Sequence, residues 1–171
     1  PVLVKNVGVD SPGMRCTPGY TMSHVRDAGT NAPDRVPPTT QWALDRGFIV
    51  LVPDHEGARM AYAEPIAAGR VVLDSIRAML NQDDQTGGNL GIGTAPLVMS
   101  GFSGGAIAAH GAGKELDRYA PGLTGRHLGP APGGLPAASA LLPASMNANL
   151  ATRALHADTP GRHRSDPDRR A

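Results

Sequence analysis

Ser103 is the residue whose surroundings point most directly to chemistry. It is the central residue of the segment 101–105, GFSGG, which matches the G-x-S-x-G pattern of a nucleophile elbow. In that pattern the serine sits on a sharp turn between a strand and a helix, where flanking glycines remove side chains that would collide. The first N–H groups of the following helix face the reacting carbonyl, so the Gly104 N–H is predicted to stabilise an oxyanion. The segment therefore predicts acyl transfer through a serine nucleophile.

A plain glycine-rich turn would also fit residues 101–105, because the chain contains 22 glycines. The flanking segments favour the elbow. The apolar run 97–99 reads as a strand that enters Gly101, and the alanine-rich segment 104–116 reads as a helix behind Ser103.

A second oxyanion donor is expected from the loop after the first strand, which begins at Asp10. The sequence of residues 10–13, DSPG, is equally typical of an ordinary β-turn. Both interpretations of Asp10 stay open at this point.

Asp54, His55 and Glu56 form a titratable cluster directly after an apolar segment. Their place at the carboxyl end of a strand is typical of a site rim, and a supporting role is favoured over direct catalysis. Neighbouring residues point in different directions and no other cluster has ligand spacing, so no metal is predicted. The glycine-rich segment 87–93 precedes a strand rather than a helix, and it predicts a flexible connection rather than a phosphate site.

The base and the acid of a serine hydrolase follow the nucleophile in chain order in this kind of fold. The histidines after Ser103 are His110, His127, His156 and His163. None of them follows a recognisable strand with an acid upstream, although Asp117 with His127 is one formal pairing. The Asp and the His of a triad are therefore not assigned.

The elements that would position Ser103 alternate between strands and helices. The sequence predicts strands over 2–9, 48–52 and 97–99, and helices over 40–46, from about 67 to 80, and over 104–116. The five apolar residues 48–52 predict a strand buried on both faces. This order predicts an α/β fold with a parallel sheet and flanking helices. It fades after Tyr119, and residues 158–171 are predicted to be disordered.

The bulk properties exclude several classes of protein. Sixteen basic and fifteen acidic residues give a formal charge of +1, which predicts no nucleic-acid partner. No apolar run is close to the length of a transmembrane helix, which is about 20 residues. The first residues lack the basic n-region and the cleavage site of a signal peptide. Cys16 is the only cysteine, so the sequence indicates neither the redox compartment of the protein nor a disulfide partner for Cys16. The oligomeric state is equally open.

Several motifs, taken in order, resemble segments of the secretory lipase family. They are DS at 10–11, CTPGY at 16–20, WAL at 42–44, VPDHEG at 52–57, VLDSIRA at 72–78, GFSGGA at 101–106, YAPGL at 119–123 and APGGLP at 131–136. The resemblance covers residues 2–136. It implies that 1–136 is the N-terminal part of an α/β-hydrolase domain, and that 137–171 is a weakly structured tail unlike the family.

The resemblance also implies a secreted lipase or esterase that acts on acyl esters such as triacylglycerols without a cofactor. Ser103 would be its nucleophile, Gly104 an oxyanion donor, and Asp10 part of the oxyanion loop. Residues 124–128 replace an apolar strand that the family pattern leads one to expect, and no triad His or Asp is identified. We therefore hypothesise that the 171 residues alone are catalytically inactive. The alternatives are a non-catalytic binding protein and a peptidase of the same fold.

Overall fold

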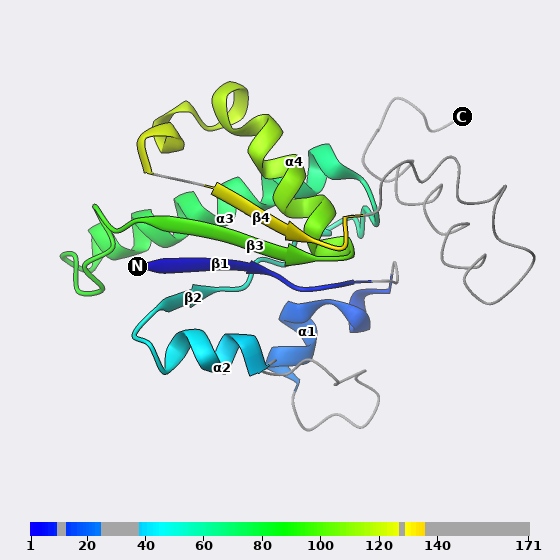
Figure 1. Cartoon of the computed structure of the whole chain (residues 1–171), viewed down its shortest axis with the longest axis horizontal. Helices are drawn as coiled ribbons and strands as arrows, with labels where there is room; N and C mark the ends of the chain where they lie inside the picture. Colours follow the sequence, from blue (N-terminus) through cyan, green and yellow to red (C-terminus); the bar gives the residue numbers. More distant parts are fainter. Residues whose placement is uncertain (10–12, 25–37, 127–128, 136–171) are drawn as a thin grey trace, which may run out of the picture.

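The computed structural model describes residues 1–9, 13–24, 38–126 and 129–135, which contain a parallel sheet flanked by helices (Figure 1). Its strands are β1 (Val2–Asn6), β2 (Ile49–Leu51), β3 (Leu97–Phe102) and β4 (Gly129–Gly133). Their order across the sheet is β2-β1-β3-β4, and every neighbouring pair is parallel. The predicted α/β class and parallel sheet are confirmed.

The helices cover the two faces of the sheet unequally. The long helices α3 (Pro65–Gln85) and α4 (Gly104–Tyr119) pack together on one face, whereas α2 (Pro38–Leu44) lies on the other (Figure 1). The short α1 (Pro18–Ser23) lies beyond the carboxyl end of β1. This arrangement follows from right-handed crossovers. From β1 the chain moves across the sheet to β2 at one edge, and from β2 it moves back past β1 to β3 and β4, so the helices of the two halves lie on opposite faces.

The core lies between the sheet and the pair α3 and α4. Alternate residues of β1 are buried, which directs Val2 and Val4 into this layer. They meet Leu73 and Ile76 of α3, which are fully buried. A Cβ on Gly111 of α4 would lie 1.9 Å from a backbone oxygen of α3, so the two helices cross at a distance that only glycine permits there.

Helix α3 is longer than the sequence predicts. It begins at Pro65 because the Glu64 carboxylate accepts the Ala67 N–H and proline favours the first helical position. Near its end the buried Asp83 carboxylate accepts the N–H groups of Leu90 and Ile92 at 2.7 and 3.0 Å. The glycine-rich segment 87–93 is thus anchored to α3 by a buried charge.

Two helical elements that precede α2 in the chain were not predicted. The 3₁₀ helix η1 (Met14–Cys16) and the helix α1 lie between the predicted strand over 2–9 and the predicted helix over 40–46, where the sequence predicts no helix or strand. A sequence signal for α1 exists, since Thr17 caps it by accepting the Tyr20 N–H at 3.2 Å and Pro18 occupies its first position.

The strand β2 is half-buried and lies at one edge of the described sheet, so the prediction of a strand buried on both faces is wrong within the described residues. At the other edge, β4 has the sequence GPAPG and follows the 3₁₀ helix η2 (Pro121–Arg126), where order was predicted to fade. Proline lacks an N–H and is tolerated at a sheet edge, which is where β4 lies.

The predicted weak structure of residues 137–171 lies outside the described residues. Within the described part of the chain, no helix is both long enough and apolar enough to cross a membrane.

Candidate active site

Ser103 occupies a strained turn between β3 and α4. Its backbone has φ 53° and ψ −120°, a conformation that is rare for any residue with a side chain. Such a conformation costs on the order of 1–3 kcal/mol and persists only where the surrounding structure enforces it. The strand, the strained serine and the helix together have the geometry of a nucleophile elbow.

The glycines around Ser103 are required by close backbone contacts. A Cβ on Gly101 would lie 2.1 Å from the Gly105 oxygen, and a Cβ on Gly105 would lie 2.0 Å from the Asn6 oxygen. A Cβ on Gly104 would lie 2.4 Å from the Val9 oxygen. Each distance is far shorter than a normal contact, so the G-x-S-x-G spacing has a steric cause here.

Backbone hydrogen bonds hold the turn in place. The Ser103 N–H donates to the Gly133 oxygen of β4 at 3.2 Å, and the Ser103 oxygen accepts the Ala106 N–H at 2.9 Å. The sequence did not predict this contribution of β4. The Gly104 N–H belongs to the first turn of α4, whose N–H groups have no acceptor within the helix, so it is available to an anionic oxygen.

Residues 7–9, which follow β1, lie along the elbow. A Cβ on Gly8 would lie 3.9 Å from the Ser103 Cβ, so the backbone at Gly8 borders Ser103 directly. Val9 is buried beside Gly104. Asp10, the next residue, lies outside the described residues, and its oxyanion role stays a prediction.

His55 contacts this segment from the loop after β2. The imidazole is buried, and its Nε2 lies 2.9 Å from the Val7 oxygen. Because a carbonyl only accepts, Nε2 carries the proton. Burial lowers the pKa of His55 below its usual 6.5, against the smaller opposing effects of the Val7 hydrogen bond and the Asp54 charge. The ring is therefore neutral at neutral pH, in line with the supporting role predicted for this cluster.

No catalytic base is evident in the described part of the chain. None of the histidines there forms a hydrogen bond with the Ser103 hydroxyl, and the Nε2 of His55 is already engaged with Val7. His110 is half-buried on α4. His127 lies outside the described residues, so its pairing with Asp117 stays untested. The described residues also contain no group of three side chains that could hold a metal ion.

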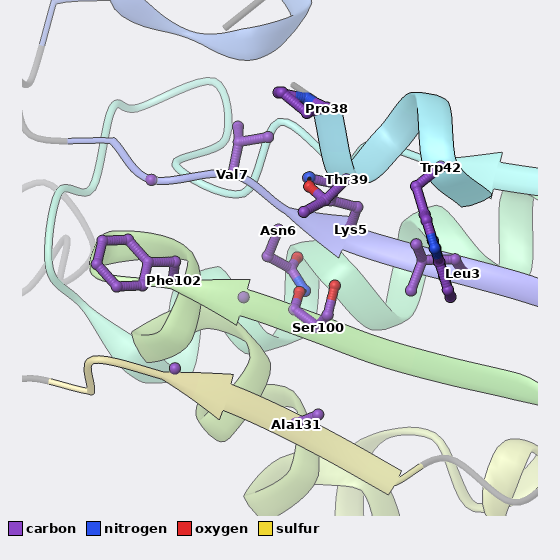
Figure 2. A pocket seen from close by; sticks show the side chains of 13 residues that line it. Leu3, Lys5, Asn6, Val7, Pro38, Thr39, Trp42, Ser100, Phe102 and Ala131 are labelled. Carbon is purple, nitrogen blue, oxygen red and sulfur yellow. Dashed lines mark hydrogen bonds between the residues drawn. The ribbon is translucent and has the colours of Figure 1, made fainter. Parts of the chain in front are cut away.

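A cavity of about 1070 Å³ opens on the sheet face that carries α2 (Figure 2). Its lining residues are Leu3, Lys5, Asn6, Val7, Gly8, Pro38, Thr39, Trp42, Ser100, Gly101, Phe102, Ala131 and Gly133. Ser103 does not line the cavity, but the preceding Phe102 does, and its side chain is 67% exposed. An apolar surface therefore extends from α2 to Phe102, the residue next to Ser103.

The parallel sheet, its flanking helices and the strained serine turn define an α/β-hydrolase fold. Comparison with known proteins agrees with this class, because the family model described as "Secretory lipase" matches residues 39–155, more than half of the chain. The chain belongs to the secretory lipase family.

Two relatives and one solved structure illustrate the likeness. Lipase 4 of Candida albicans is 37% identical over 125 residues, which cover 73% of this chain and 27% of that protein. A Mycobacterium tuberculosis protein named "Probable inactive lipase" is 33% identical over 124 residues, which cover 72% and 27%. The crystal structure of Candida antarctica lipase A in its closed state superposes with a TM-score of 0.77 at 27% identity, covering 98% of this chain and 38% of that one. The chain thus spans about a quarter of the length of the curated relatives it matches.

Proposed function

We propose that this chain carries the nucleophile and the oxyanion site of a secreted, serine-dependent carboxylic ester hydrolase. The observation that supports this most strongly is the strained backbone of Ser103 at the junction of β3 and α4. A strained turn persists only where the fold enforces it, and here the serine hydroxyl is placed at the start of a helix dipole.

The proposed reaction starts with attack of the Ser103 Oγ on the carbonyl carbon of an ester, while a histidine base takes the hydroxyl proton. The resulting oxyanion is held by the Gly104 N–H and by an N–H of the Asp10 loop. Collapse breaks the bond to the alcohol, which leaves with the proton from the histidine. Water then hydrolyses the acyl-enzyme, which releases the carboxylic acid and restores Ser103.

Triacylglycerol-type esters are the proposed substrates. The exposed Phe102 and the apolar cavity beside it give the nucleophile an apolar approach, which suits acyl chains better than peptide groups. The description of the matching family as secretory supports an extracellular enzyme. No cofactor is required, because the serine provides the nucleophile and the backbone provides the oxyanion donors.

A second candidate is a catalytically inactive member of the family, or a binding protein built on the same fold. Two observations favour it: none of the described histidines forms a hydrogen bond with the Ser103 hydroxyl, and one relative is itself named a probable inactive lipase. Without its base, the serine hydroxyl would keep little nucleophilicity.

Labelling with a fluorophosphonate probe separates the two candidates, because the probe reacts readily with activated serines. We expect Ser103→Ala to abolish labelling of the chain and the matched control Ser100→Ala to retain it. A wild-type chain labelled no faster than Ser103→Ala would favour the inactive candidate.

Turnover tests a further point, because attack by Ser103 and hydrolysis of the acyl-enzyme both need a base, and no histidine of the described residues forms a hydrogen bond with Ser103. We expect the 171-residue chain to show no turnover of p-nitrophenyl butyrate. Turnover that disappears in Ser103→Ala would overturn this expectation and would place the base within the chain.

A further inference from the structure

Residues 7–9 connect the end of β1 to the predicted oxyanion loop, and they contact the elbow at two points. A Cβ on Gly105 would lie 2.7 Å from the Val7 oxygen, and a Cβ on Gly104 would lie 3.1 Å from the Val9 nitrogen. The backbone of the segment is therefore packed against the backbone of the first turn of α4. A small shift of residues 7–9 would change the space around the Gly104 N–H.

β-ladder pairing does not hold this segment, since β1 ends at Asn6, which pairs with Gly101. The Val7 oxygen instead accepts a hydrogen bond from the Nε2 of His55, 48 residues further along the chain, at 2.9 Å. The imidazole is only 3% exposed, so its packing fixes the direction in which it donates. His55 thus ties the first residue after β1 to the loop after β2.

We propose that His55 is a positioning residue that holds residues 7–9 against the elbow and so sets the position of the Val9 backbone relative to the Gly104 N–H. The catalytic consequence rests on the proposed function, whereas the anchoring of residues 7–9 does not. The Nε2 of His55 is not free to act as a base, because it already donates to Val7, and the residue is buried.

Two substitutions distinguish the hydrogen bond from simple filling of space. His55→Gln keeps a donor close to the position of Nε2, whereas His55→Leu fills much of the volume and leaves the Val7 oxygen without its donor. Both are made in the full 171-residue chain, and their global stabilities are measured by urea unfolding so that local effects can be separated from global ones.

Backbone ¹⁵N relaxation is the primary measurement, and it does not depend on activity. We expect His55→Leu to lower the order parameters of Gly8 and Val9 from about 0.85, the value of rigid backbone, towards the range below about 0.6 that marks flexible backbone. His55→Gln should leave both order parameters as they are in wild type. Unchanged order parameters in His55→Leu, or an equal drop in both variants, would overturn the proposal.

Two further readouts complete the test. In the wild type, the imidazole ¹⁵N shifts should show a neutral ring protonated at Nε2, and a ring protonated at Nδ1 alone would overturn the proposal even if His55→Leu fails to fold.

Where the wild type is labelled by a fluorophosphonate, His55→Leu should lower the limiting labelling rate and leave the half-saturating probe concentration unchanged, and His55→Gln should restore the rate. A wild-type labelling rate in folded His55→Leu would refute the proposal while the proposed function stands. Absent wild-type labelling with the expected change in order parameters would refute the proposed function while the anchoring role stands.

Discussion

Replacing Gly105 with alanine tests whether backbone contact between α4 and β1 builds the elbow. The added Cβ would lie 2.0 Å from the Asn6 oxygen and 2.7 Å from the Val7 oxygen. Both atoms are backbone, so no side-chain rotation relieves the clash, and either β1 or the first turn of α4 must move. Gly113 is the matched control on the same helix, because a Cβ there would lie 3.3 Å from the Pro130 side chain and would meet no backbone atom within 4 Å.

Of the two substitutions, only Gly105→Ala should lower the free energy of unfolding. Overpacking against rigid structure costs up to about 3 kcal/mol, whereas alanine gains about 1 kcal/mol over glycine within a helix. Gly105→Ala should therefore lower the free energy of unfolding by about 2 kcal/mol. Gly113→Ala should leave it unchanged or raise it by up to about 1 kcal/mol.

Urea unfolding followed by circular dichroism measures both changes, and an unchanged m-value shows that the unfolded states are comparable. In the folded fraction, Gly105→Ala should also lose fluorophosphonate labelling, because the displaced turn no longer presents Ser103. The steric explanation of the G-x-S-x-G spacing is refuted if Gly105→Ala is as stable as wild type. Equal losses in the two variants would refute it too.

The remaining predictions concern three other positions. Gly8→Val should lower the labelling rate by about tenfold with little change in stability, because its side chain would border Ser103 but avoid tight contacts; unchanged labelling would show that the probe approaches from elsewhere. The lowered pKa of His55 means that the unfolded chain binds more protons than the folded chain. The contribution of His55 to the free energy of unfolding should therefore be complete above about pH 6.5 and should be lost as the pH falls below that value. His55→Gln should flatten this slope between pH 7.5 and 5.5 in urea titrations, and an identical slope in both proteins would assign it to other groups. Asp83→Ala should cost about 2 kcal/mol of unfolding free energy and speed amide exchange in residues 87–93, and a neutral result would show that the segment is held without the carboxylate.

The sequence predicts the elbow well because its determinants are local. A strand entering Gly101, a helix leaving Gly104 and glycines at fixed spacing are visible as hydrophobic pattern and residue type. The structure adds the reason for the glycines. Gly101 meets the Gly105 oxygen within the turn, whereas the glycines at 104 and 105 meet the Val9 and Asn6 backbones, which lie about 95 residues earlier in the chain. Contacts of that range leave no periodic signal.

Other parts of the fold depend on context that the sequence does not display. The strand β4 contains neither alternation nor β-branched residues, and it forms because the backbone of β3 offers it a partner. The hydrogen bond from His55 to Val7 is similarly hidden, although the titratable cluster after β2 marked the region. The Asp and the His of the triad stay unassigned, because no described histidine forms a hydrogen bond with the Ser103 hydroxyl.

The most direct test of the central claim is to identify the residue that carries the phosphonate after labelling. The labelled chain is digested and its peptides are sequenced by mass spectrometry. The proposed function predicts an adduct on Ser103 alone, which is lost in Ser103→Ala and retained in Ser100→Ala. An adduct on any other residue, or no adduct on folded protein, would contradict the assignment of Ser103 as an activated nucleophile.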